Sequence, residues 1–497
     1  MIVTLAAHTR LMNATRNALI TALWNHVGGS PDLLSTVEID GPDVVLPSVF
    51  DVTGFAAAAV GVANLAVAEL AAARSGRPVP GVRVDRRHAA AAFVCERLLS
   101  GVGWELAPVW DPIAGDYETA DGWIRLHTNY SYHRDAVTSL LGVTADRDVV
   151  AAAVKRWAGD DLEHAVVDAG GCAAVMRTAE QWRSHPAGIA ASTESPVTVT
   201  VTHLPHPVLS CESPTRVVLS QDRTGVVGAR PLDGVRVLDL TRVIAGPVAT
   251  RFLAAHGADV LRIDPPGFAE VELLLPETTR GKRCAALDLR DRVDRATFEH
   301  LVSQADVVVA GLRPGAMTGL GYGPEALREL NGSVITVNHS AYGWSGPWAD
   351  RRGFDSLVQM SAGIAAAGIP PGVAGSRPAP LPAQALDHGT GFLLAAATCR
   401  ALTERLVHGR TCDVRGSLLG AANVLMAHPT PGAISTPPPT WTDADTESVT
   451  THWGSVHQAR IPGIIDDCPA AFDPNLDAGP LGRHRAEFAT LSASRAS

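Results

Sequence analysis

The stretch PLDGVRVLDLTRVIAGPVATRFLAAHGADVLRIDPP, residues 231–266, decides the fold prediction for this chain. Residues 234–240 have the apolar pattern of a buried strand, residues 249–258 that of a helix, and residues 259–264 that of a second strand. A strand, a helix and a strand in this order form a parallel pair joined by a right-handed crossover. The stretch therefore predicts the start of an α/β sheet.

The same alternation continues along the chain. Strand patterns recur at 284–289, 306–312 and 333–340, and helical patterns lie between them at 295–304 and 324–330. Alternating strands and helices of this length are typical of an open parallel sheet with helices on its faces. We therefore expect an α/β fold with a Rossmann-like domain over 233–427 and a smaller α+β domain elsewhere.

Length and charge narrow the classes of function. The chain has 497 residues, which is long for one hydrophobic core and favours two or three domains. Its formal net charge is -10, without a basic block, and this argues against nucleic acid as the main partner. An anionic ligand would need a local basic pocket that works against the overall charge.

Cysteine usage and the apolar runs indicate a reduced, cytoplasmic protein. The seven cysteines are scattered, with no spacing that suits a zinc site, so neither a metal nor a disulfide framework is expected. The N-terminus lacks a basic region before an apolar stretch, so no signal peptide is predicted. Ala-rich runs at 55–73 and 392–402 end in charged residues too early for a membrane span, and we interpret them as buried helices.

These two Ala-rich runs resemble each other. TGFAAAAVGVANLAVAEL (53–70) and TGFLLAAATCRALTERL (390–406) share a Thr-Gly-Phe start, and an aspartate precedes each, Asp51 and Asp387. Two Ala-rich helices can look alike by chance. The shared start and the similar sequence that follows favour an internal duplication.

Two segments are candidates for binding an anion. In TRVIAGPVATRF (241–252) a strand ends and a helix begins, which places backbone N–H groups at the edge of the sheet. This is not the GxGxxG pattern, and many similar turns bind nothing. Arg280, Lys282 and Arg283 lie together before a strand, where they form either a phosphate clamp or a solvated basic loop.

Asp387 is the candidate for covalent chemistry. It precedes a helix in ALDHGTGFLLAAATCRAL (385–402), where an aspartate is most often an N-cap. The alternative is a carboxylate that attacks a thioester carbonyl, with Gly389 and Gly391 leaving room for a bulky substrate. The residues alone leave both roles open.

Read in order, these segments resemble the class III (CaiB/BaiF-type) CoA-transferases. The similarity covers 231–266, 280–290, 305–368 and 385–402, with order and spacing preserved. The resemblance implies the fold of that family, acyl-CoA as a substrate, and Asp387 as the catalytic carboxylate. It places CoA contacts on Val243–Ile244, Leu287–Arg290 and the Gly311–Gly315 loop. Together with the basic segment, the expected CoA-binding residues are Val243, Ile244, Arg280, Lys282, Arg283, Leu287, Arg290, Gly311, Arg313 and Gly315.

The chain departs from the family in two ways. Gly311 stands where Asn is frequent, and Pro265 stands where some members carry Arg. The family's small domain is expected at 117–202, upstream of the Rossmann-like domain, with a partial first copy at 1–116, a linker at 203–232 and an irregular tail at 428–497. Such a chain would form a pseudo-dimer within itself or a homodimer. Because Asp51 lacks a Rossmann-like half, we expect a single site at Asp387.

Three functions follow as alternatives. The first is transfer of CoA from an acyl-CoA thioester to a carboxylic acid through an aspartyl anhydride and an aspartyl-CoA thioester. The second is an α-methylacyl-CoA racemase, which the resemblance disfavours because Phe354 replaces the histidine of its proton-abstracting pair. The third is a CoA-binding protein without activity. The substrate pocket is expected to include His339, Tyr342, His388, Gly389 and Gly391.

Overall fold

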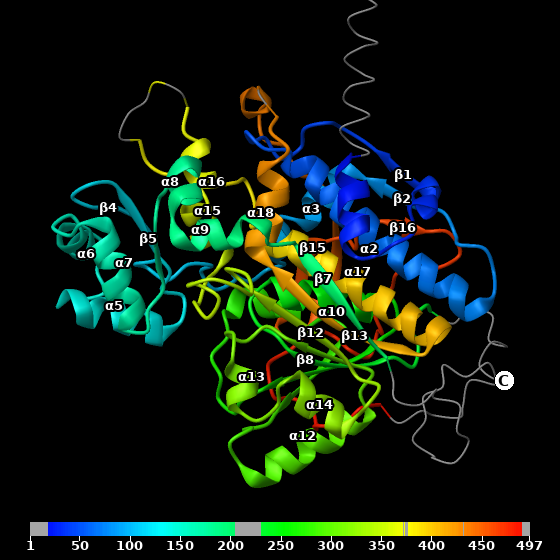
Figure 1. The fold of residues 1–497 in the computed structure, drawn as a ribbon. Coiled ribbons are helices and arrows are strands. Elements are labelled where there is room, and N and C mark those ends of the chain that lie inside the picture. The colour runs from blue at the N-terminus through cyan, green and yellow to red at the C-terminus, as the bar shows by residue number, and fades with distance from the viewer. Residues whose placement is uncertain (1–17, 204–229, 371, 373–375, 431, 490–497) are drawn as a thin grey trace, which may run out of the picture.

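A seven-stranded sheet forms the centre of the molecule (Figure 1). The computed structural model of this protein describes residues 18–203, 230–370, 372, 376–430 and 432–489. The strand order is β10-β9-β8-β11-β12-β13-β7, and only β7 pairs antiparallel with its neighbour. The strands are β7 (Val197–His203), β8 (Arg236–Leu240), β9 (Asp259–Asp264), β10 (Lys282–Ala286), β11 (Val307–Ala310), β12 (Ile335–Ser340) and β13 (Arg410–Ser417). The parallel Rossmann-like sheet predicted from residues 231–340 is confirmed.

Alternation of side chains along the strands gives the sheet two apolar faces. Val237 and Val260 contribute to one buried cluster and Leu238 and Leu261 to the other, because successive strand residues point to opposite faces. Helices α10 (Ala245–Ala255) and α17 (Ala385–His408) contribute to the first cluster. Helix α12 (Arg292–Gln304) covers the second face together with α14 (Pro324–Leu330), as Figure 1 shows.

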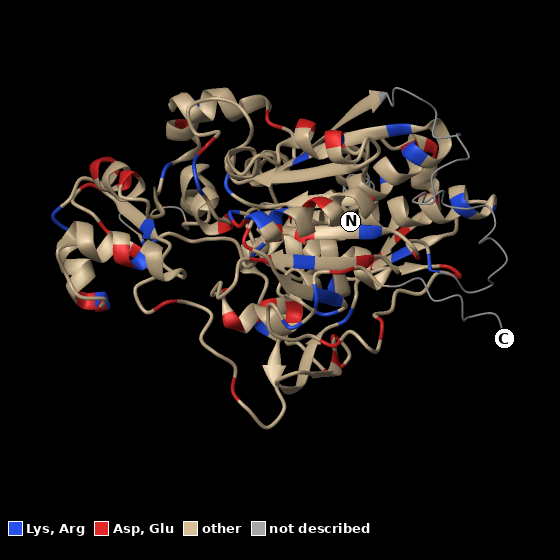
Figure 2. Ribbon diagram, turned by 90° about the horizontal axis from the view of Figure 1, so that it is seen from below, with Lys and Arg blue, Asp and Glu red and all other residues tan. Residues whose placement is uncertain are grey.

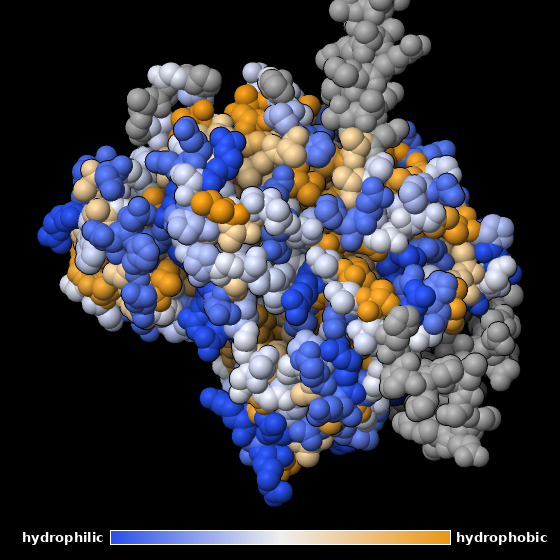
Figure 3. Space-filling model, viewed as in Figure 1, coloured by the Kyte–Doolittle hydropathy of each residue, from blue (hydrophilic) through white to orange (hydrophobic). Residues whose placement is uncertain are grey.

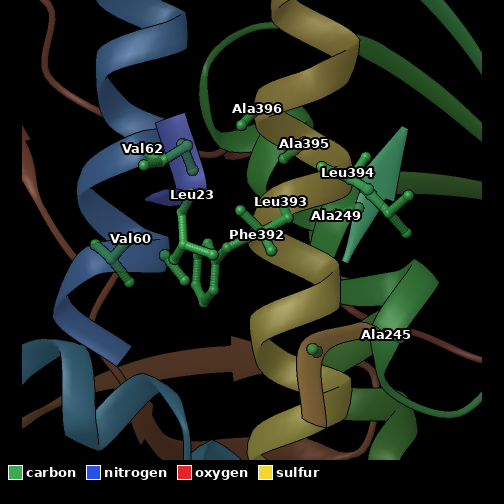
Figure 4. Close-up of a cluster of buried hydrophobic side chains, with 14 of the residues drawn as sticks. Leu23, Val60, Val62, Ala245, Ala249, Phe392, Leu393, Leu394, Ala395 and Ala396 are labelled. Carbon is green, nitrogen blue, oxygen red and sulfur yellow. The ribbon is translucent and has the colours of Figure 1, made fainter. Parts of the chain in front are cut away.

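The two Ala-rich segments form helices that pack together. Side chains of α2 (Val52–Ser75) face those of α17 around Leu23, and Ala245 and Ala249 of α10 close the other side of α17 (Figure 4). Among the described helices, α2 alone has the length and hydropathy of a membrane span, and 83% of its apolar window is buried inside the protein. Packing against α17 accounts for its apolar composition.

The first Ala-rich helix also repeats the connection of the second. α2 lies between the parallel strands β1 (Val37–Asp40) and β2 (Val82–Asp85). α17 likewise precedes β13, which pairs parallel with β12, although α15 (Asp355–Ser361) and α16 (Ile364–Ala367) also lie in that connection. This shared strand–helix–strand unit agrees with an internal duplication, which stays a prediction.

A smaller domain lies beside the main sheet (Figure 1). An antiparallel sheet, β4-β5-β6, packs with three helices around its own core, which includes Ile124, Val150 and Leu162. Its elements are β4 (Gly115–Glu118), β5 (Trp123–Leu126), α5 (Ser131–Leu141), α6 (Arg147–Val154), α7 (Gly159–Asp168) and β6 (Ala173–Val175). The expected unit 117–202 differs at its end, because β7 belongs to the main sheet. Of the expected linker 203–232, residues 204–229 lie outside the described residues.

The expected irregular tail after 427 contains strands. β14 (Thr446–Thr451) and β15 (Gly454–Ala459) form a hairpin that pairs with β3 (Ser100–Gly101), and β16 (Ile464–Ile465) pairs with β2. The prediction differed because these strands are short, lie between Pro-rich segments, and find their partners far away in the sequence. Shorter helices complete the fold: η1 (Pro31–Thr36), α3 (Arg86–Ala92), α4 (Cys95–Leu98), α8 (Ala179–Ser184), α9 (Pro186–Ala190), η2 (Ala191–Thr193), η4 (Glu272–Leu274), α11 (Leu275–Thr278), α13 (Ala316–Gly319), α15 (Asp355–Ser361), α16 (Ile364–Ala367), α18 (Leu418–Met426) and η5 (Ala433–Ser435).

The surface is mixed in charge and polarity. Acidic and basic residues are interspersed along the ribbon in Figure 2, and apolar residues appear as small groups among hydrophilic ones on the face in Figure 3. All six cysteines within the described residues are free, and five of them are buried. Because acidic and basic residues are interspersed along the chain, a basic binding region must be sought in a cavity.

Candidate active site

A cleft of about 340 Å³ opens at the carboxyl ends of the central strands. Val243–Ala245 follow β8, Gly311–Pro314 follow β11, and His339–Ala341 end β12, while Tyr130 and His133 reach the cleft from the small domain. After β8 the chain builds the sheet outward through β9 and β10, then returns to add β11 and β12 on the other side. Such a switch point is where open α/β sheets bind ligands.

Asp387 lies in the wall of this cleft, in the first turn of α17. It is not the N-cap, because Gln384 holds that position. The capping contact comes from Asp355 on α15, whose Oδ2 accepts the backbone N–H groups of Leu386 at 2.8 Å and Asp387 at 2.9 Å. The Asp387 side chain is 9% exposed, and its carboxyl group forms no hydrogen bond or ion pair with the described residues. The more common role for an aspartate here, capping, is thus performed by another residue.

The surroundings of Asp387 favour its neutral form. Burial raises the pKa of Asp387 well above its usual value, and the negative charges of Asp355 and Glu96 raise it further. Burial likewise raises the pKa of Asp355 to about 6, although the backbone N–H groups that it accepts oppose the shift. A buried carboxylate without a compensating cation is unstable relative to its protonated form. A carboxyl group with such a shifted pKa that also lines a cleft is a candidate for a catalytic role.

Asp387 also lines a second, inner pocket of about 110 Å³. Tyr130, Val243, Ile244 and Phe354 border both spaces, so the carboxyl group lies where the two meet. The walls of the inner pocket are largely apolar and include Val109, Trp110, Val271 and Leu274. One space at this junction is suited to a polar ligand and the other to an apolar group.

The cleft is basic although the whole chain is acidic. Four arginines line it: Arg242, Arg313, Arg351 and Arg352. Arg351 donates to Glu163 at 2.8 Å and Arg352 to the carbonyl of Gly170 at 2.9 Å, whereas Arg313 is exposed and its guanidinium has no partner among the described residues. The histidines add no charge, since burial lowers the pKa of His133 and of His339 to about 4. Arg242 lies 3.6 Å from Asp264, so Arg313 is the cleft arginine without a partner among the described residues, and an anionic ligand would pair with it first.

The structure brings several predicted residues to the cleft. Val243, Ile244, Gly311, Arg313 and His339 all line it beside Asp387. A Cβ on Gly311 would lie 2.2 Å from Nε2 of His339. The imidazole of His339 thus occupies the space that a side chain at 311 would need, which explains glycine at this position.

The predicted phosphate clamp at 280–283 requires correction. Nζ of Lys282 is fully buried and donates to Asp239 at 2.9 Å and to Thr250 at 2.7 Å. Arg280 donates to Glu447 at 2.6 Å, and Arg283 pairs with Asp259. All three cations are engaged by the fold, and none lines the cleft.

Three other expected CoA contacts also lie outside the cleft lining. Leu287 is buried in the core that α12 covers, and Arg290 is exposed and pairs with Asp288 at 2.9 Å. Gly315 is the N-cap of α13, with φ 77°. Tyr342 is buried and its hydroxyl lies 3.0 Å from that of Ser361, so it does not reach the cleft either. The local sequence pattern placed these residues near the correct edge of the sheet, but it did not indicate where each side chain points.

His388 and the two glycines have packing roles. Nε2 of His388 lies 3.1 Å from Oε2 of Glu96, and its ring stacks on Phe93. Burial would raise the pKa of Glu96, but the hydrogen bond with His388 keeps it below the usual value. With Cys95 these two residues form a buried group of three potential metal donors. The contact between His388 and Glu96 explains how both polar side chains are accommodated in the core.

Gly389 and Gly391 let other elements approach α17, and they do not make room for substrate. A Cβ on Gly389 would lie 2.3 Å from Cε1 of Phe55, and one on Gly391 would lie 2.6 Å from the carbonyl oxygen of Ala245. We expect Gly391→Ala to lower the free energy of unfolding by about 1–3 kcal/mol, because the methyl group overpacks the contact with α10. Urea denaturation measures the free energy of unfolding, and Ala397→Gly provides the reverse substitution in the same helix for comparison. Equal stability of Gly391→Ala and wild type would contradict the packing role.

Asp51 differs from Asp387 in its local role. It is the N-cap of α2, and its Oδ1 accepts the backbone N–H of Gly54 at 2.7 Å. Neither of the two cavities that Asp387 lines includes Asp51. The two aspartates that precede the Ala-rich helices are therefore not equivalent.

Sequence reasoning missed several residues of the site. Arg351 and Arg352 stand in the segment WADRRGFD, and the paired arginines beside a glycine were a usable signal. Phe354 of the same segment was considered for the racemase alternative but not as a wall of the site. Glu96, His127 and Tyr130 come from distant segments, and no local pattern marks them. Phe354 stacks on His127, with ring centroids 3.7 Å apart, and so fixes one wall of both spaces.

Comparison with known proteins finds similarity over part of the chain. Residues 232–452 match the model of CoA-transferase family III. The chain is 34% identical over 229 residues to the "Probable fatty acyl-CoA transferase" of Mycobacterium tuberculosis. This alignment covers 42% of this chain and 57% of the relative. It is 37% identical over 154 residues to the acetyl-CoA:oxalate CoA-transferase of Acetobacter aceti, covering 29% of this chain and 40% of that relative.

A crystal structure of the mycobacterial protein aligns with 36% identity and a TM-score of 0.38, over 40% of this chain and 56% of that one. The chain thus spans little more than half the length of this relative, and less of the other. Over residues 232–452 this chain is thus similar to CoA-transferase family III.

Proposed function

We propose that this protein is a CoA-transferase that moves CoA from an acyl-CoA thioester to a carboxylic acid, with Asp387 as the nucleophile. One observation carries the proposal: the Asp387 carboxyl group has no partner among the described residues and lies where a basic cleft meets an apolar pocket. The cleft suits the phosphates of CoA, and the inner pocket suits the acyl group. The thioester carbonyl would then lie at Asp387.

The chemistry follows from this placement. Asp387 attacks the thioester carbonyl carbon in its ionised form, which the raised pKa makes the minor form before the reaction. The C–S bond breaks, CoA departs as the thiolate, and an acyl-aspartyl anhydride forms. The thiolate attacks the aspartyl carbonyl, the donor acid departs as carboxylate, and an aspartyl-CoA thioester forms. An acceptor carboxylate reverses these two steps, which regenerates Asp387. Electrons and protons balance without a further reactant.

The test is chemical trapping of the aspartyl intermediates. The protein is incubated with a panel of acyl-CoAs, quenched with hydroxylamine, digested and examined by mass spectrometry. We expect a hydroxamate on the peptide that carries Asp387, and none in the Asp387→Ala variant. A hydroxamate on the Asp51 peptide would place the nucleophile in the wrong segment, and CoA binding without any label would contradict covalent transfer.

Arg313 is expected to contribute to binding CoA phosphates. Its exposed guanidinium lines the cleft and has no partner among the described residues, so a phosphate would be its first counter-charge. We expect Arg313→Gln to raise KM for acyl-CoA by about 10-fold with little change in kcat. Steady-state kinetics at several salt concentrations measures this, and Arg328→Gln, outside the cleft, is the control. An unchanged KM would exclude this contact.

The racemase alternative lacks its histidine at 354. A different histidine, His127, does line the inner pocket, and burial lowers its pKa well below the usual value. It is therefore neutral, but the same burial makes it a weak proton acceptor, and Phe354 covers its ring face. Incorporation of deuterium at the α-carbon of a 2-methylacyl-CoA in D₂O would support proton abstraction, and CoA exchange without incorporation supports transfer.

A further inference from the structure

One residue of the turn between β8 and α10 is held in a strained backbone conformation. Val243 has φ 64°, and among the described residues only Asp467 and glycines also have a positive φ. A β-branched side chain is unfavourable in this region of backbone conformation, where glycine would fit without strain. Because Val243 lines both the cleft and the inner pocket beside Asp387, the strain lies at the site itself.

The loop after β9 holds this turn in place. The carboxylate of Glu270 accepts the backbone N–H of Val243 at 3.3 Å, and the same oxygen accepts a guanidinium N–H of Arg262 at 2.9 Å. The ring centroid of Phe268, in the same loop, lies 3.6 Å from Cζ of Arg242. Two successive residues of the turn, Arg242 and Val243, are therefore fixed by one loop.

The other oxygen of Glu270 connects the turn to the small domain. Oε1 accepts the hydroxyl group of Tyr130 at 2.8 Å and the backbone N–H of Val271 at 3.0 Å. Tyr130 is buried and lines both the cleft and the inner pocket, as Val243 does. One carboxylate thus joins two walls of the site that come from different domains.

All four groups that Glu270 contacts donate hydrogen bonds to it. They are two backbone N–H groups, a guanidinium and a hydroxyl group. A carboxylate offers acceptor sites on both oxygens and carries no donor, so it can accept all four. A glutamine would replace one oxygen with an NH₂ group, which would face two of these donors. The arrangement therefore requires a carboxylate, and the fully buried guanidinium of Arg262 is its counter-charge.

We infer that Glu270 is a positioning residue of this site: it fixes Val243 and Tyr130 in the arrangement that holds a thioester carbonyl at the nucleophile. This inference rests on the proposed function. Glu270 lines neither the cleft nor the inner pocket, so it acts through the residues that do. Its loss should therefore slow the reaction of the bound thioester more than it weakens the binding of CoA.

The experiment measures single-turnover labelling of Asp387 by the acyl-CoA that labels the wild type best. We expect Glu270→Gln to lower the rate constant by about 10- to 100-fold, the effect of misplaced reacting groups. The dissociation constant of CoA, from calorimetric titration, should change by less than about 3-fold. Tyr130→Phe removes one of the four donors and should lower the rate constant by about 2- to 10-fold. The double variant should react at the rate of Glu270→Gln alone, because the Tyr130 hydroxyl group acts through Glu270.

The matched control is Tyr117→Phe. The Tyr117 hydroxyl group donates to the carbonyl of Ile113 at 2.7 Å inside the small domain, and Tyr117 lines neither the cleft nor the inner pocket. This variant should keep the wild-type rate constant.

Two results would overturn the inference while leaving CoA transfer standing. If Glu270→Gln lowers only the fraction of protein that is labelled and not the rate constant, Glu270 serves folding alone. If the effects of Glu270→Gln and Tyr130→Phe multiply in the double variant, the Tyr130 hydroxyl group acts independently of Glu270.

If no thioester labels Asp387, the proposed function fails, and hydrogen exchange still tests how Glu270 holds the turn. We expect the backbone amide of Val243 to exchange at least about 10-fold faster in Glu270→Gln than in the wild type, because it loses its acceptor. Mass spectrometry of peptides that cover residues 241–248 measures the exchange. An unchanged exchange rate there would overturn the inference.

Discussion

Asp387→Asn is expected to lose CoA transfer by at least about 10⁴-fold and to unfold at a higher temperature than the wild type. The loss follows because an amide cannot form the anhydride, and removal of a covalent nucleophile has effects of this size. The gain follows because the native structure buries the Asp387 carboxyl group near Asp355 and Glu96 without a partner. Relief of such a group is expected to add about 1–2 kcal/mol to the free energy of unfolding at neutral pH.

The stability gain has a defined dependence on pH. The pKa of Asp387 is raised in the folded protein, so between the ordinary carboxyl value of about 4 and the raised value the folded state holds a proton that the unfolded state has lost. The free energy of unfolding of the wild type therefore falls as pH rises through this window. Asp387→Asn lacks this loss, and the two proteins should differ least below about pH 4.

Urea denaturation at several pH values and acyl-CoA kinetics measure both effects. Asp51→Asn is the matched control, because Asp51 precedes the equivalent helix but caps it. Since Asn also caps helices well, this variant should keep both transfer and stability. Equal activity of Asp387→Asn and wild type would exclude Asp387 as nucleophile, and a lower stability would mean that its carboxyl group is stabilised in the folded state.

Lys282→Met is expected to lower the free energy of unfolding by about 3–5 kcal/mol, because it leaves the buried carboxylate of Asp239 without its cation. Burial lowers the pKa of Lys282, while the charge of Asp239 opposes this shift. The pair also engages Thr250, whose hydroxyl donates to Asp239 at 2.6 Å. A phosphate-binding lysine would instead change the affinity for CoA.

Chemical denaturation and the KM for acyl-CoA separate these roles. The variant should unfold at markedly lower urea concentration, and the fraction that is folded should keep a normal KM. Arg290→Gln is the control, because Arg290 is exposed and was expected to contact CoA from the family resemblance. This variant should leave the denaturation midpoint unchanged. If Lys282→Met is as stable as the wild type but its KM rises, the phosphate clamp was the better interpretation.

The strands of the main sheet could be predicted because their signals are local. Residues 236–240, 259–264 and 307–310 are buried on both faces and rich in Val, Leu and Ile, as is typical of buried parallel strands. The hairpin at 446–459 could not be predicted in the same way, because its strands are half exposed and its outer partner is the dipeptide Ser100–Gly101. Pairing between segments so far apart leaves little trace in a local window.

The candidate site shows the same difference between local sequence signals and long-range contacts. The sequence by itself determined the α/β class and the sheet edge where the cleft lies, because these follow from hydrophobic periodicity, and the resemblance to a known family directed attention to Asp387. Only the tertiary structure decided that Asp355 caps α17 in place of Asp387 and that Lys282 is buried with Asp239. It also decided that Arg313 lines the cleft. The physical reason is that the role of a charged side chain depends on its partner, and in a folded chain the partner is usually distant in sequence.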